Sequence, residues 1–119
     1  MPCDERSEGE KLALKLVRGL SKDEATCVIA ILSLGAARLL SHSFRFWPIA
    51  EQLVFNGQTL LLCLDAIGDQ ELGDVVAAGN EIEDVMLMFS DPAKYAENCA
   101  LVETGVLAVL ARFCAGDDV

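Results

Sequence analysis

The chain has 119 residues, enough for one domain with one hydrophobic core. Apolar residues make up 53% of it and aromatic residues only 6%, a composition that favours packed helices over sheets and excludes intrinsic disorder. Residues 1–45 hold seven basic and six acidic side chains, whereas residues 46–119 hold two and thirteen, giving a net charge of −10. Nucleic acids and anionic membrane surfaces bind clustered Lys and Arg, so the sequence predicts neither as a partner.

The sequence predicts a short N-terminal tail followed by one domain. Residues 1–6 are expected to form a flexible tail, and residues 7–119 a single helical domain. A leucine at every fourth position, together with the capping-box spacing of Ser7 and Glu10, predicts a first helix over residues 8–19.

The second helix is expected over residues 22–40, opened by another capping-box pair, Ser21 and Glu24. It is apolar nearly all round, which is typical of a helix at the centre of a fold. Its apolar run, residues 25–40, is too short to span a bilayer and favours a core helix. His42 falls in the connector that follows.

Two Leu-containing helices follow the connector. Pro48 suits the first turn of a helix, which predicts one over residues 48–55. The next is expected over residues 58–67 and ends at Gly68, a residue that readily adopts the left-handed conformation of a helix C-terminus.

The C-terminal third predicts three more helices. Gly79 is expected to end a helix over residues 70–78, and Asn80 has the spacing of a capping residue for a short helix over residues 80–89. A Ser-Asp-Pro sequence opens the last helix, over residues 92–115.

These elements together predict an all-α fold, an irregular bundle of five to seven helices. The helices over residues 22–40 and 92–115 are apolar on most faces, so we expect them to pack together at the centre, covered by the others. No period of 20–50 residues recurs, which argues against a solenoid.

The five cysteines are predicted to be reduced, small hydrophobic residues. Their number is odd and no two of them form a CxxC pair, which favours a reducing compartment. The N-terminus lacks the basic and then apolar pattern of a signal peptide, so we expect a cytoplasmic protein. The five are Cys3, Cys27, Cys63, Cys99 and Cys114.

The sequence shows no catalytic or metal-binding constellation. His42 is the lone histidine, and a Ser-His-Ser sequence lacks the spacing and the positioned nucleophile of a hydrolase triad. One histidine and scattered cysteines form no zinc motif, and no phosphate-binding loop or dinucleotide fingerprint occurs. We therefore expect a non-enzymatic protein without a cofactor or metal ion.

One stretch resembles a known family. The residues IAEQLVFN at positions 49–56, followed by GNEIEDV at positions 79–85, are similar to a pattern in short bacterial helical proteins of unknown function, in which an AExLxF helix precedes a GxELEDV turn and helix. The resemblance covers about residues 45–90. It implies a small bacterial helical domain and brings no activity with it.

The strongest functional signal is a run of carboxylates without basic residues between Arg45 and Lys94. One interpretation is solubility alone; the other is a docking surface for a basic partner protein, such as a toxin or effector, on an inhibitor, immunity-type or adaptor protein. The sequence leaves a homodimer open. The residues predicted to contact a partner are Glu51, Asp69, Glu71, Asp74, Glu81, Glu83, Asp84 and Trp47.

Two alternatives remain open at this point. Trp47 and its aromatic neighbours Phe44 and Phe46 suit either a binding hot spot or a hydrophobic plug between two helices. The carboxylates also suit a small enzyme or ligand sensor with a carboxylate-lined groove between helices 3 to 6, counted in chain order.

Overall fold

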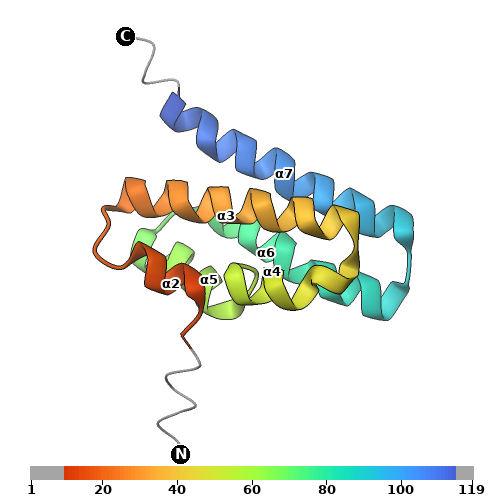
Figure 1. Ribbon diagram of the computed structural model, residues 1–119. Coiled ribbons are helices and arrows are strands. Elements are labelled where there is room, and N and C mark those ends of the chain that lie inside the picture. Colours follow the sequence, from red (N-terminus) through yellow and green to blue (C-terminus); the bar gives the residue numbers. More distant parts are fainter. Residues whose placement is uncertain (1–9, 115–119) are drawn as a thin grey trace, which may run out of the picture.

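The computed structural model describes residues 10–114, apart from the side chains of Phe89 and Cys114. The expected tail and the Ser7 cap lie outside the described residues. Within them the chain forms helices and no strands, which confirms the all-α prediction. The helices, labelled as in Figure 1, are α2 (Leu12–Val17), α3 (Lys22–His42), η1 (Phe44–Phe46), α4 (Trp47–Leu53), α5 (Gly57–Leu61), η2 (Leu62–Ile67), α6 (Gln70–Asp84), η3 (Val85–Phe89) and α7 (Pro92–Cys114).

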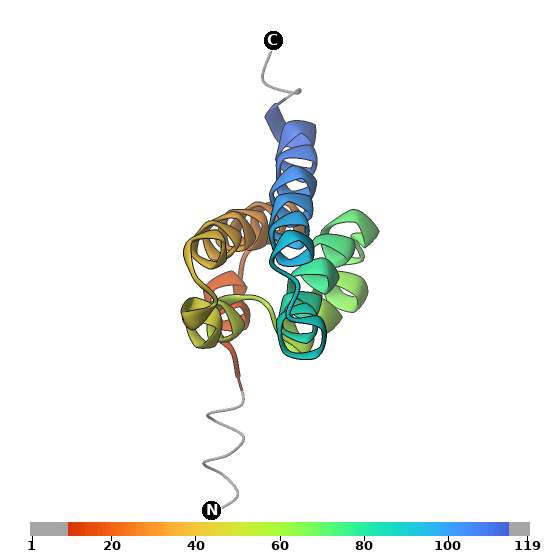
Figure 2. The same cartoon turned by 90° about the vertical axis from the view of Figure 1, so that its right-hand side faces the viewer.

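The three long helices pack against one another. Helix α7 packs against both α3 and α6 and runs antiparallel to each, with one side free of neighbouring helices (Figures 1 and 2). The short helices α2, α4 and α5 lie on the opposite side of α3 from α7 (Figure 1). The predicted packing of α3 against α7 is therefore confirmed, but α7 lies at the surface of the bundle and is not covered on its outward side.

Helix α3 begins where its capping box predicted. The Ser21 Oγ accepts a hydrogen bond from the Glu24 N–H at 3.1 Å, and the Glu24 carboxylate accepts one from the Ser21 N–H at 3.0 Å. The helix ends two residues later than expected, so the exposed His42 belongs to its last turn and not to a connector. By length and composition alone, α3 could cross a membrane, but the core helix of a soluble protein meets the same criterion. Eight of its residues are buried in this structure.

Helix α6 corrects one prediction. Gly79 was expected to end a helix and Asn80 to cap the next, but α6 continues through both as far as Asp84. Gly79 is buried, and a Cβ atom on it would lie only 2.3 Å from two ring carbons of Phe55. This glycine permits close packing against a ring and is not a helix stop.

The aromatic segment after α3 is a plug. The rings of Phe44 and Trp47 stack at 6.2 Å, and Phe44 meets Tyr95 of α7 edge-on at 6.0 Å. The Tyr95 hydroxyl donates to the Leu40 carbonyl, which ties the start of α7 to the end of α3. Trp47 is only 9% exposed. Its side chain is thus part of the core, which corrects its assignment as a partner contact.

Other boundaries differ by a few residues. Helix α2 is shorter than the predicted 8–19, and the predicted helix over 58–67 appears as α5 continued by the wider turns of η2. The end at Gly68 is confirmed, because its φ of 72° places it in the left-handed region.

Candidate functional site

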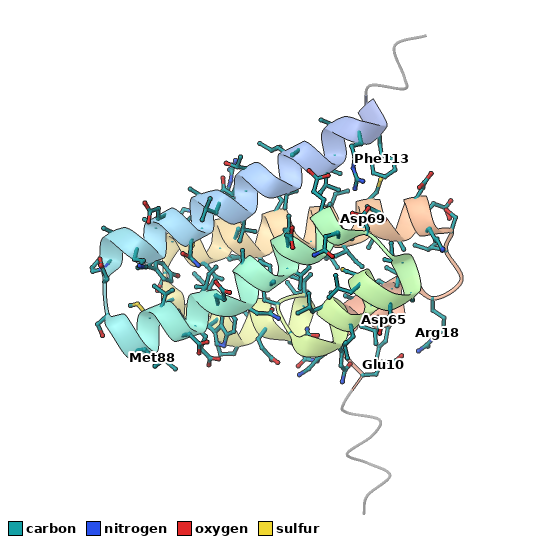
Figure 3. All side chains as sticks on the ribbon, turned by 180° about the vertical axis from the view of Figure 1, so that it is seen from behind. Glu10, Arg18, Asp65, Asp69, Met88 and Phe113 are labelled. Atoms are coloured by element: carbon teal, nitrogen blue, oxygen red, sulfur yellow. The ribbon has the colours of Figure 1, made fainter. Side chains whose placement is uncertain are left out.

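The predicted acidic residues do not form one surface. They come from α4, from the first turn of α6 and its cap, and from the rest of α6, and each group has different neighbours. Two of the three groups are paired with cations. In Figure 3, α6 runs from the end of the bundle where Asp69 and Phe113 lie toward the opposite end, where Met88 of η3 lies.

The first group surrounds Arg112 of α7. Asp69 caps α6, where its carboxylate accepts a hydrogen bond from the Leu72 N–H at 3.0 Å. The same carboxylate pairs with Arg112 Nη2 at 2.7 Å, and Glu71 lies 3.4 Å from Arg112 Nε. This cluster fastens the last turns of α7 to the start of α6, so its role in the structure is to join two helices.

The pH dependence of stability should reveal this cluster. Burial raises the pKa of Asp69, but hydrogen bonds from the Leu72 N–H and Arg112 outweigh it and lower the pKa below the ordinary 3.8. Because the pKa of Asp69 is lower in the folded chain than in the unfolded chain, its charge stabilises the fold at pH values above the unfolded pKa. This stabilisation is lost as the pH falls through the folded pKa. Asp69→Asn keeps a good capping residue but removes the charge. We expect it to cost about 1 kcal/mol at neutral pH.

The measurement is urea unfolding at pH 7 and again below the folded pKa of Asp69. The difference between wild type and Asp69→Asn should shrink at the lower pH, because the wild-type carboxyl is then protonated. A difference that stays constant with pH would show that the ion pair with Arg112 contributes nothing to stability.

The second group is Glu51 of α4. Its side chain is partly buried and lies 3.1 Å from Lys11 Nζ, at the start of α2. The Glu51 carbonyl also accepts a hydrogen bond from the Asn56 side chain at 2.7 Å. Glu51 therefore joins the short helices α2 and α4. Its role differs from that of the α6 carboxylates with which the sequence analysis grouped it.

The third group is in no ion pair found among residues 10–114, although the Asp74 carboxylate accepts a hydrogen bond from the Gln70 side chain at 2.9 Å. Asp74, Glu81 and Asp84 are exposed on α6 and separated by seven and three residues, so they share one side of the helix, here called the α6 acidic face. The ion pairs found within residues 10–114 involve other carboxylates: Glu10, Glu51, Asp69, Glu71 and Glu103.

Glu83 does not belong to this face. It is two residues from Glu81, and residues two apart on a helix do not point the same way. It is also half-buried, whereas Glu81 and Asp84 are exposed. The acidic triplet that the sequence suggested is therefore divided between two sides of α6.

Two of the described cysteines, Cys63 and Cys99, are buried thiols. Cys27, Cys63 and Cys99 are free, while Cys3 and the Cys114 side chain lie outside the described part of the structure. Burial, followed by the charge of Asp69, raises the pKa of Cys63 to about 12. Burial also raises the pKa of Cys99. Neither thiol therefore ionises readily near neutral pH, and a thiol that stays protonated is a poor nucleophile. No group of three metal-binding side chains occurs among the residues described.

An exposed apolar face on α7 was missed by the sequence reasoning. We expected this helix to be covered on most sides, but Leu101 is 60% and Leu107 58% exposed. The signal that could have revealed this face is a heptad spacing, which is typical of a helix that packs along another helix. The residues with this spacing are Ala93, Glu97, Ala100, Thr104, Leu107 and Ala111.

Comparison of the chain with protein-family models, with curated proteins and with solved structures finds no match.

Proposed function

We propose that this chain is a non-enzymatic interaction protein whose α6 acidic face docks onto a basic partner protein, as an inhibitor, immunity-type protein or adaptor would. The observation that carries the proposal is the α6 acidic face itself: three exposed carboxylates on one side of a helix, apart from the ion pairs found among the described residues. A positive surface would be attracted to this side of the bundle.

The arrangement also has a small energetic cost. Glu81 and Asp84 are three residues apart on α6 and carry the same charge. Such pairs destabilise a helix by a few tenths of a kcal/mol, and a cationic partner would relieve this repulsion. The alternative, an enzyme or ligand sensor with an acidic groove, draws no support from Glu51 and Asp69, two of the three half-buried carboxylates of the predicted set, because each is paired with a separate cation. The third, Glu83, lies on a different helix from Glu51 and fourteen positions after Asp69.

The test starts by isolating the partner. The immobilised protein is used at low salt to retain basic proteins, and a salt gradient releases them. The association rate of each released protein is then measured by surface plasmon resonance across a range of salt concentrations. Glu81→Lys/Asp84→Lys should slow association at low salt by roughly tenfold and flatten its salt dependence.

The matched control is Asp23→Lys/Asp65→Lys. Both of these residues are exposed, and the double variant has the same net charge as the test variant but leaves the α6 acidic face intact. It should associate nearly at the wild-type rate. Equal slowing by both variants would mean that total charge alone steers the partner, and an unchanged rate for the test variant would remove α6 from the docking site.

A further inference from the structure

The outward side of α7 is an apolar surface on an otherwise acidic protein. Every residue on this side is exposed, and the helix packs against α3 and α6 with its other sides (Figure 2). Glu97 is the one charged residue of the set, and it lies near one end. The set, here called the α7 outer face, is Ala93, Ala96, Glu97, Ala100, Leu101, Thr104, Leu107, Ala108 and Ala111.

The spacing on this face matches the seam of a coiled coil. Its central line advances by alternating steps of four and three residues, from Ala93 through Thr104 to Ala111. This is the heptad pattern with which a helix packs along a second helix. Most of its members are small, so a second helix could approach at about 8 Å between axes, the close end of the usual range.

The face is complementary to itself about Thr104. Consider an antiparallel pair of α7 helices related by a two-fold axis at Thr104. A residue of one copy then lies level with the residue of the other copy that is equally far from Thr104 in the opposite direction, so their numbers sum to about 208. Leu101 then meets Ala108 of the second copy, and Leu107 meets Ala100, each on the same side of the seam. A large side chain faces a small one at both places, which is how packed helices interdigitate.

The charges are complementary in the same register. Glu97 of one copy lies level with Arg112 of the other, on the same side of the seam, and two-fold symmetry makes this pair twice. Arg112 is exposed at the edge of the face, with 43% of its side chain accessible beside Asp69 and Glu71. Between Glu97 and Arg112 the face carries no charge, so two chains of net charge −10 can approach there with little repulsion.

We propose that the protein forms a homodimer in which the α7 outer faces of two copies pack antiparallel about Thr104. The contact is isologous, because each copy presents the same surface to the other. It leaves the α6 acidic faces uncovered, so a dimer would carry two of them. The proposal stands on the exposed leucines and the register of α7, and it is independent of the proposed function.

Sedimentation velocity from micromolar to submillimolar concentration tests the dimer. The wild type should sediment with twice the mass of its 12.8 kDa chain. Leu107→Glu should sediment as a monomer, because two-fold symmetry would place two charges in the apolar seam. The control is Leu61→Glu on α5, since Leu61 is 61% exposed, nearly the same as Leu107, and lies off the face. It should remain dimeric.

A second measurement tests the antiparallel register. In a background with Cys3 and Cys114 changed to serine, Thr104→Cys should cross-link on oxidation, because axis residues come within the roughly 7 Å Cα separation that a disulfide needs. Ala96→Cys should not cross-link, since the two copies of residue 96 would lie about 24 Å apart along the seam. Cross-linking at both positions would indicate a parallel pair and overturn the proposal.

The same experiments show whether something other than a second copy covers the α7 outer face. A wild-type chain that stays monomeric throughout the concentration range overturns the homodimer. So does a dimer that Leu107→Glu leaves intact, because its contact then lies elsewhere. A monomer that co-sediments with uncharged phosphatidylcholine vesicles, and loses this property in Leu107→Glu, would assign the face to lipid instead. Circular dichroism of each variant confirms that the helices are still formed.

Discussion

Ile29→Asp is expected to lower the free energy of unfolding by about 4 kcal/mol or more, a large part of the roughly 5–15 kcal/mol that stabilises a domain. Ile29 lies in the middle of α3 with its side chain fully buried, at 0% exposure. A carboxylate placed there has no cation to pair with in the apolar core around it, so it must either unfold the chain or take up a proton at great cost.

The matched control is the same substitution two residues later. Ile31 is on the same helix but 59% exposed, because a shift of two residues turns a side chain away from the core. Ile31→Asp should change the free energy of unfolding by no more than about 0.5 kcal/mol. Urea unfolding followed by circular dichroism measures both variants. Similar losses for the two would mean that α3 is not buried on the side that the structure shows.

Gly79→Ala is expected to destabilise the protein by about 2 kcal/mol, although alanine is the better helix former by about 1 kcal/mol. The new methyl group would lie 2.3 Å from two ring carbons of Phe55, and it would have to displace the ring. Phe55 is only 1% exposed and packed in the core, so the ring cannot move without disturbing its neighbours. The clash therefore outweighs the gain in helix propensity.

Gly35→Ala separates these two effects. Gly35 lies in the interior of α3, is exposed, and has no atom within 4 Å of the position its Cβ would take. The substitution should therefore stabilise the protein, by roughly 0.5–1 kcal/mol. Thermal and urea unfolding of the two variants should give opposite signs. If Gly79→Ala also stabilises the protein, α6 does not pack closely against Phe55.

Local features of the sequence determined where α3 and α7 begin and where η2 ends. The Ser21 and Glu24 capping box, the left-handed Gly68 and the proline near the start of α7 act through bonds and torsion angles within a few residues. The apolar pattern of α3 was equally informative, because a helix that is apolar nearly all round can be shielded from water only at the centre of a bundle.

Tertiary packing decided the features that the sequence reasoning got wrong. Gly79 resembles a helix stop in sequence, yet the ring of Phe55, far away in the chain, occupies the space beside it and makes a small residue necessary within a continuous helix. Trp47 is suited to a binding surface or to a plug, and its stacking on Phe44 in the core decided between the two.

In the candidate site too, local sequence features determined one part and tertiary packing another. Counting carboxylates predicted an acidic C-terminal region, but only the fold brings Arg112 against Asp69 and Lys11 against Glu51, leaving Asp74, Glu81 and Asp84 as the α6 acidic face. Composition and helical periodicity are local properties, and the sequence alone determined them. Two outcomes depend instead on residues far apart in the chain that only folding brings together: which charges pair, and which side of α7 stays uncovered. Lys11 and Glu51 are 40 positions apart, and Asp69 and Arg112 are 43 positions apart.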